Sequence, residues 1–351
     1  MIQKIWFTLV WSYMKFGLFF YSKKITVLGR KNIPKKGAVL FVVNHPNGLV
    51  DPLYVTTTNR RQNHFLVRAA SFKKPFVKKI LESLYLMPIY RMRDGVKQLA
   101  NNQEIFEKCH IILNKGETLM IFPEGTHDKK RTVRSLSKGF TRILFGALEK
   151  HKDLEITVIP VGITYQHTSQ FPAKVTVNYG EPIATRTIFE TNSSAKSILI
   201  LKSIVSEQLK KLSVHIPDDE NYDSILQKLI DAQVDFTAIN NVNEMIKNNA
   251  FPPKKSPKKN HLKALRFLII LNTIIPFLLW KKTSKKIGEI EFIDTFRFSF
   301  SIVLCGLFYG LQSWIVSLFF GNILGFFYLS VSALLILMYV KLVPTNAKKY
   351  V

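Results

Sequence analysis

Cysteine is scarce in this chain. The 351 residues include only two, Cys109 and Cys305, and they lie far apart in the sequence. This number excludes a framework of several disulfides and a cysteine-rich zinc site, and it fits a reducing compartment. The length still allows one large domain, or two smaller ones, to bury a full core.

Acidic residues are also few. The chain has 24 aspartates and glutamates against 50 lysines and arginines, which gives a formal net charge of +26. Such a balance predicts an anionic partner, either nucleic acid or anionic lipid. The apolar content of 47%, with 27 phenylalanines, favours lipid. A nucleic-acid-binding protein is the more distant alternative, because it has no use for long apolar runs.

The C-terminal part lacks charge altogether between Phe298 and Val340. A membrane-spanning helix needs about 20 apolar residues, so this stretch is long enough for two. Gly321, Asn322 and Gly325 are expected to form the turn between them, and basic residues flank the pair on both sides. By the positive-inside rule, residues 297–351 are predicted to form a transmembrane hairpin and tail with both ends in the cytosol.

The N-terminal segment, residues 1–24, lacks the compact cationic start and the small-residue cleavage site of a secretory signal. Its polar residues recur three, four or seven positions apart along one helical stripe: Lys4, Thr8, Ser12, Lys15 and Ser22. The other face is rich in Trp, Phe and Leu. This pattern predicts a helix in the membrane interface. A spanning helix is the alternative, and the central lysine argues against it.

Between about residues 25 and 185, short β-rich runs alternate with helical stretches, which predicts an α/β domain with a sheet between helices. Strands are expected at 38–43, 65–69, 118–122, 156–160 and 174–179, and helices at 74–85, 94–114 and 138–150.

The next segments differ in composition. Residues 186–250 are polar and predict a helical appendage, and residues 251–263 predict an exposed basic linker. Residues 264–296 are apolar at first but are interrupted by Arg266 and Pro276, so we expect a re-entrant or interfacial segment there.

"VVNHPNGLVDP", residues 42–52, places His45 after an apolar run and Asp51 six positions later. A neutral imidazole can take a proton from a hydroxyl when a carboxylate holds its other nitrogen. The pair is therefore a candidate general base with its orienting acid. The alternative is an ordinary loop, since His and Asp often fall this close by chance.

Three further stretches carry candidate residues. "LMIFPEGTHD" ends a strand in Glu124 and Gly125, and a buried strand-end glutamate is costly unless it accepts hydrogen bonds. "LMPIYRMRDG" places Arg91 and Arg93 after an apolar run, and arginine suits bidentate capture of a phosphate. "VIPVGITY" contains Pro160. Taken singly, these are a routine turn, surface arginines and a packed strand.

Together, and in this order, the stretches resemble the glycerolipid acyltransferase family of glycerol-3-phosphate and lysophosphatidate acyltransferases. The likeness covers residues 25–185. The blocks that carry it are Asn44-His45 through Asp51-Pro52, Arg91, Phe122–Thr126, Ser137–Phe140, Ile159–Val161 and Asn178–Ile183. The resemblance implies an α/β catalytic domain with a mixed sheet flanked by helices. The apolar pattern adds an N-terminal membrane-associated helix before this domain and a C-terminal transmembrane hairpin after it.

The resemblance also implies the roles. His45 would be the base, Asp51 its partner and Arg91 the anchor of the acceptor's phosphate. Glu124, Gly125 and Thr126 would shape the acceptor site, and Pro160 would help position the acyl chain or support the site. Their positive charge alone makes four further residues candidates for contact with phosphate, the acyl carrier or lipid headgroups: Arg93, Arg131, Arg134 and Lys138. A solvated surface position is an equally good interpretation of each.

The implied reaction is direct acyl transfer in phospholipid biosynthesis, from an acyl-CoA or acyl carrier protein thioester, with no metal and no cofactor. Five residues separate His45 from Asp51, whereas the family usually has four. The longer gap is similar to the eukaryotic-type branch, which implies glycerol-3-phosphate or dihydroxyacetone phosphate as acceptor. Lysophosphatidate or another lysolipid remains the alternative, followed by a non-catalytic lipid-binding membrane protein. Membrane lipids are the expected partners, with the catalytic domain on the cytoplasmic face.

Overall fold

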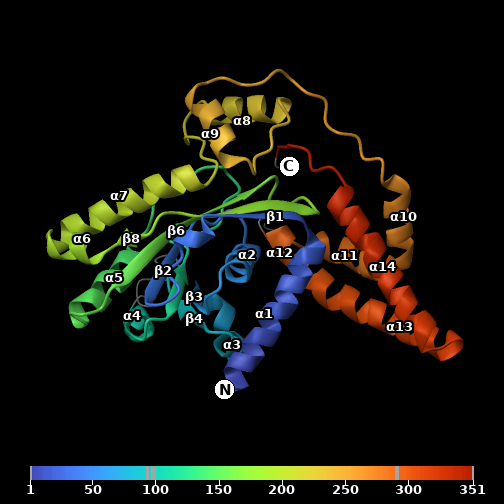
Figure 1. Ribbon diagram of the computed structural model, residues 1–351, viewed down its shortest axis with the longest axis horizontal. Coiled ribbons are helices and arrows are strands. Elements are labelled where there is room, and N and C mark those ends of the chain that lie inside the picture. The colour runs from blue at the N-terminus through green and yellow to red at the C-terminus, as the bar shows by residue number, and fades with distance from the viewer. Residues whose placement is uncertain (1, 92–94, 96–99, 289–291, 350–351) are drawn as a thin grey trace.

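A computed structural model describes residues 2–91, 95, 100–288 and 292–349. One mixed sheet lies at its centre, with strands in the order β1-β7-β6-β2-β5-β3-β4, and β8 pairs with β6. β7 and β8 run antiparallel to β6, whereas the other neighbours are parallel. Figure 1 shows helices on both sides of the sheet. The expected α/β class and mixed sheet are confirmed.

The five expected strands are present as β2 (Ala38–Val43), β3 (Asn63–Arg68), β5 (Thr118–Ile121), β6 (Ile156–Tyr165) and β7 (Ala173–Tyr179). The pattern did not predict β1 (Ser22–Leu28) or the short β8 (Ile183–Ala184), and β4 (Leu86–Ile89) was only a strand-like run. Because β1 begins at Ser22, the N-terminal helix α1 (Ile2–Tyr21) ends before residue 24, where it was expected to end.

The central strand β2 is buried on both faces, and its alternate residues supply two cores. Leu40 and Val42 face a cluster built from α4 (Asn102–Asn114), α5 (Gly139–Lys150) and α7 (Ser194–Leu212). Phe41 and Val43 face a second cluster with α2 (Val50–Thr58), α1 and α12 (Ile293–Phe300). Period-two alternation thus sends successive side chains of one strand into different layers.

Two expected helices are present as α3 (Pro75–Ser83) and α5. The third, expected at 94–114, is α4 from Asn102 on, and most of its expected start lies outside the described residues. The region expected as a helical appendage contains α6 (Arg186–Glu190), α7, α8 (Tyr222–Asp231) and α9 (Ile239–Lys247). α8 and α9 share a small core, whereas α7 packs on the main sheet.

The apolar C-terminal part folds as expected for a hairpin. Within the described residues, two helical stretches are long and apolar enough to cross a membrane, Ile293–Phe320 and Asn322–Leu342. The first joins α12 to α13 (Gly306–Phe320), and the second is α14. Gly321 links α13 to α14 with φ of +88°, a conformation that suits glycine.

Before the hairpin, α10 (Lys263–Asn272) and α11 (Ile274–Ser284) bend against each other by 95°, as a broken span or a re-entrant loop would. Figure 1 shows α1 on the same side of the molecule as α10–α14. The outer face of α1 exposes Leu9, Phe16 and Phe19. This arrangement is compatible with the interfacial helix, which stays a prediction.

Candidate active site

Three parallel strands deliver the candidate residues to one edge of the sheet. His45 follows β2, Glu124 follows β5 and Arg91 follows β4. In the sheet these strands lie in the order β2-β5-β3-β4, so their carboxyl ends face the same way. Open α/β sheets place ligands at this edge.

His45 and Asp51 meet. Nδ1 of His45 lies 2.8 Å from Oδ2 of Asp51, and the Asp51 side chain is fully buried whereas that of His45 is 18% exposed. The sequence placed Asp51 on a turn. It lies instead in the first turn of α2, which begins at Val50. The five-residue gap therefore preserves the contact.

Two more donors fix the Asp51 carboxylate. The hydroxyl of Tyr165 donates to Oδ1 at 2.6 Å, and the backbone N–H of Asn47 donates to Oδ2 at 2.7 Å. Burial raises the pKa of Asp51, and these two hydrogen bonds act in the opposite direction. A carboxylate held by three partners cannot rotate freely, so it fixes the orientation of the imidazole.

The imidazole of His45 stacks on the ring of Phe122, with ring centroids 4.3 Å apart. Burial lowers the pKa of His45 to about 4, with smaller contributions from Glu124, which raises it, and Arg134, which lowers it. The ring is therefore neutral at neutral pH. Among the described residues Nε2 has no hydrogen-bond partner, so this nitrogen is available to accept a proton.

Glu124 points inward. Its side chain is 3% exposed and its Oε2 lies 2.7 Å from Nη2 of Arg134. The same oxygen accepts the backbone N–H of His45 at 3.4 Å, and Arg134 also donates to the hydroxyl and the carbonyl of Thr126. Glu124 and Arg134 thus tie the chain after β5 to the chain after β2. Arg134 has this definite place, which charge alone had not distinguished from a surface site.

Arg91 also contacts this loop. Its Nη1 donates to the carbonyl of Gly125 at 2.9 Å, and Gly125 has φ of +72°, in the region that favours glycine. Arg93 lies outside the described residues.

The remaining predicted residues lie further from the imidazole. Lys138 is exposed at the residue before α5, and within the described chain it makes no hydrogen bond to the His45 network. Pro160 is buried in β6 beside Val42, where its carbonyl accepts the N–H of Gly180 at 2.8 Å. Its position supports the strand rather than lining the surface next to His45.

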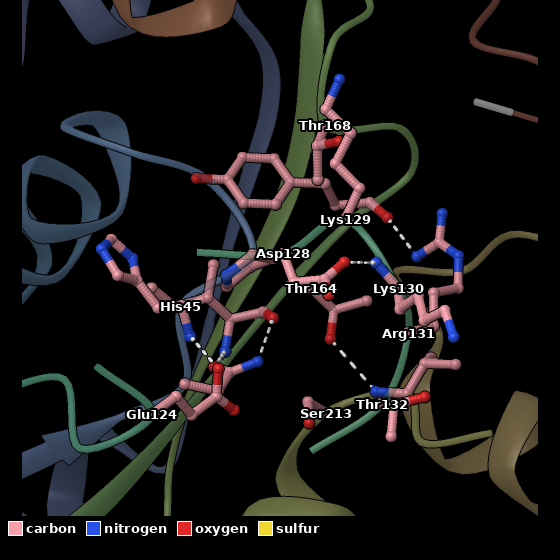
Figure 2. Close-up of a pocket in the computed structure, with 15 residues that line it drawn as sticks. His45, Glu124, Asp128, Lys129, Lys130, Arg131, Thr132, Thr164, Thr168 and Ser213 are labelled. Atoms are coloured by element: carbon pink, nitrogen blue, oxygen red, sulfur yellow. Dashed lines mark hydrogen bonds between the residues drawn. The ribbon is translucent and has the colours of Figure 1, made fainter. Parts of the chain in front are cut away.

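A small recess adjoins the site on the other side of His45. Figure 2 shows the imidazole pointing away from Arg131 and Thr132, whereas the backbone of His45 lies beside Glu124. The guanidinium of Arg131 donates to the carbonyls of Tyr165 and Gln166, each at 2.9 Å. Arg131 is therefore part of the framework behind the site.

Two residues that hold the site in place were given no role by the sequence. Tyr165 ends the quoted stretch "VIPVGITY", and a tyrosine at the end of a buried strand was the available signal. Asn44 binds β6 through both ends of its amide, donating to the carbonyl of Ile163 at 3.1 Å and accepting its N–H at 2.7 Å. This contact fixes the chain immediately before His45.

No cluster of three or more His, Cys, Asp or Glu side chains that could hold a metal ion occurs in the described ranges.

Comparison of the sequence with known proteins shows similarity to acyltransferases. Residues 24–164 match the family model described as Acyltransferase. The chain is 29% identical over 94 residues to glycerol-3-phosphate O-acyltransferase 1 of Saccharomyces cerevisiae, covering 27% of this chain and 12% of that protein. It is 30% identical over 147 residues to a probable 1-acyl-sn-glycerol-3-phosphate acyltransferase of Mycoplasma pneumoniae, covering 38% and 50%. The chain thus spans half or less of the length of these two relatives.

Among solved structures, the crystal structure of the 1-acyl-sn-glycerophosphate (LPA) acyltransferase PlsC from Thermotoga maritima matches with a TM-score of 0.45. The identity is 19%, over 62% of this chain and 83% of that chain. The matched family region includes β2, β5 and most of β6, together with His45, Asp51, Arg91 and Glu124. Residues 24–164 are therefore similar to the acyltransferase family in the part of the chain that holds these residues.

Proposed function

We propose that this protein transfers a fatty acyl group from an acyl thioester to a hydroxyl of glycerol-3-phosphate, or of the related dihydroxyacetone phosphate, in phospholipid biosynthesis. The observation that carries the proposal is the contact of 2.8 Å between His45 and the buried Asp51. The match of residues 24–164 to the Acyltransferase family model supports the reaction class.

In the proposed mechanism, Asp51 accepts the Nδ1–H of His45, so Nε2 is the basic nitrogen. Nε2 takes the proton of the acceptor hydroxyl while the hydroxyl oxygen attacks the thioester carbonyl. The new C–O bond forms, the C–S bond breaks, and the thiol leaves with a proton returned from the imidazolium. Asp51 stabilises the imidazolium between these steps.

The proposed acceptor site lies beside the loop that contains Glu124, Gly125 and Thr126. Arg91 is the proposed phosphate anchor, because its guanidinium reaches this loop and a planar guanidinium matches phosphate oxygens. Glu124 and Arg134 act as supports of the loop in this scheme. Lys138 and Arg93 remain candidate contacts to phosphate, donor or lipid headgroups, and Pro160 a support of β6.

A second candidate acceptor is 1-acyl-sn-glycerol-3-phosphate. Support for it comes from the match over 147 residues to the Mycoplasma pneumoniae relative, which is named for this acceptor. The five-residue gap after His45 favours glycerol-3-phosphate by the resemblance described above.

The decisive assay uses membranes from cells that express the full chain. Glycerol-3-phosphate, dihydroxyacetone phosphate and lysophosphatidate are offered separately, each with acyl-CoA and with acyl-loaded carrier protein. His45→Ala should abolish transfer, whereas His261→Ala, a histidine exposed in the basic linker, should not change it. Transfer to lysophosphatidate alone would replace the proposed acceptor. Full activity of His45→Ala would refute the mechanism.

We also propose that the helical stretches Ile293–Phe320 and Asn322–Leu342 span the membrane and that the catalytic domain lies on its cytoplasmic side. Support comes from their length and apolar composition and from the lysines beyond α14. In a cysteine-free background, Asn322→Cys at the turn should react with an impermeant maleimide in intact cells. Lys255→Cys, in the exposed linker, should react only after permeabilisation. The reverse pattern would invert the orientation.

A further inference from the structure

The five-residue loop between His45 and Asp51 is not free at the surface, because the start of the membrane hairpin packs against it. The side-chain amide of Asn47 donates to Oδ2 of Asp294 at 2.9 Å. The backbone N–H of Leu49 donates to Oγ1 of Thr295 at 3.0 Å. Asp294 and Thr295 belong to α12, the first helix of the hairpin.

Gly48 lies between these two contacts and allows the close approach. A Cβ on Gly48 would lie 2.8 Å from Oγ1 of Thr295 and 3.4 Å from the ring of Phe292. The first distance is too short for any real side chain. The loop and α12 are therefore in contact along three successive loop residues.

Asp294 is buried, with 1% of its surface exposed, although it begins an apolar helix. A negative charge in the first turn stabilises a helix through its dipole. That role does not require burial, because the carboxylate oxygens could then remain in contact with water. Here both oxygens are used outside α12: Tyr21 of α1 donates to one and Asn47 to the other. Arg297, one turn later, lies 3.6 Å away and balances the charge.

Asn47 connects this contact to the base. The second hydrogen of its amide goes to the carbonyl of Thr168 at 3.0 Å, so the side chain has little freedom to turn. Its backbone N–H donates to the same Asp51 oxygen that faces His45. A continuous set of hydrogen bonds thus runs from Asp294 through Asn47 and Asp51 to the imidazole.

We propose that Asp294 and Thr295 are positioning residues for the His45–Asp51 pair, so that the start of the membrane hairpin is part of the active-site support. The inference rests on the proposed acyl transfer, because its consequence is a rate. It assigns the extra loop residue a physical use: the longer loop reaches α12 and is fixed there.

The test compares isosteric variants in the full chain, purified in a detergent or nanodisc. Thr295→Val removes the hydroxyl and keeps the shape, and Thr295→Ser keeps the hydroxyl. Asp294→Leu removes both oxygens that accept hydrogen bonds, and Asp294→Asn keeps one oxygen that can accept from the Asn47 amide. Ser313→Ala is the control, because it removes a hydrogen bond of 2.9 Å inside the hairpin, from Ser313 to the Gly325 carbonyl.

Two measurements are made on each variant. Hydrogen–deuterium exchange of a peptide covering residues 44–52 reports whether the loop is held, and needs no substrate. Steady-state kinetics separates kcat from the KM of each substrate. Thr295→Val and Asp294→Leu should exchange about tenfold faster in this peptide and lose about 10- to 100-fold in kcat, with KM within about twofold. Thr295→Ser and Asp294→Asn should recover most of both, and Ser313→Ala should resemble the wild type.

The outcomes separate this inference from the proposed function. Unchanged exchange in both Thr295→Val and Asp294→Leu overturns the inference, whatever the rates. Faster exchange with unchanged kcat also overturns it, since the contact would then be structural only. If the wild type transfers acyl groups to no acceptor, the proposed function fails, while faster exchange in the two variants would still support the holding contact.

Discussion

Tyr165, the last residue of β6, donates a hydrogen bond of 2.6 Å to the carboxylate of Asp51 in the first turn of α2. The two residues are 114 positions apart. Both are buried, so the carboxylate has no water to replace a lost donor. The hydroxyl of Tyr165 therefore limits the positions that Asp51 can take beside His45.

Tyr165→Phe should lower kcat by about tenfold, because Asp51 would lose one of the donors that set its angle to the imidazole. Tyr179→Phe is the matched control: its buried hydroxyl contacts Thr58 at 2.8 Å and the Val55 carbonyl at 3.0 Å, on the far part of α2. Each variant should lose about 1–3 kcal/mol of stability. Equal kcat losses in the two variants would assign Tyr165 a structural role only.

Arg134→Met should be strongly destabilising, by about 3–5 kcal/mol, because it leaves the buried Glu124 without its cation. Burial already raises the pKa of Glu124, and removal of Arg134 should raise it further. Glu124→Gln combined with Arg134→Met should recover much of the loss, since no buried charge remains. Chemical denaturation in detergent measures the free energy of unfolding of the wild type, the two single variants and the double variant, which completes the double-mutant cycle. Additive losses would show that the pair is not coupled.

The pH profile should reveal the buried state of His45. Burial lowers its pKa to about 4, so its neutral form should persist well below pH 6.5. At pH 5.5 about 3% of such a histidine is protonated, against about 90% for one with an ordinary pKa. We expect kcat, measured at saturating acceptor, to remain near its maximum at pH 5.5. Saturation matters because the acceptor phosphate takes up a proton near pH 6. A half-loss near pH 6.5 would contradict the prediction.

Gly162→Ala should destabilise the fold by about 1–3 kcal/mol or more, because the added methyl has no room. A Cβ at Gly162 would lie 2.2 Å from the carbonyl oxygen of Leu212, which is backbone and cannot move aside easily. Gly310→Ala is the control, since its Cβ would meet nothing within 4 Å. Thermal unfolding should give a lower melting temperature for Gly162→Ala than for Gly310→Ala. Equal melting temperatures would show that α7 can shift away from β6.

Helix α2 was not predicted from the sequence, and the reason is physical. α2 has the sequence "VDPLYVTTT", in which β-branched residues disfavour a helix. Pro52 is tolerated because it lies in the first turn, where no intrahelical N–H bond is required. The helix forms because Val50, Tyr54 and Val55 are buried against the sheet. Tertiary packing therefore overrode the local preference.

The sequence by itself determined the α/β class, the central strands, the apolar hairpin and the proximity of His45 to Asp51. Each of these depends on periodicity or on residues a few positions apart, which local chain geometry constrains. Only the tertiary structure decided that Tyr165 holds Asp51, that Arg134 pairs with Glu124 and that Asp294 holds the loop. Tyr165–Asp51 and Asn47–Asp294 join residues 114 and 247 positions apart. Contacts at such separations depend on the order of strands and the packing of helices, which no local pattern specifies.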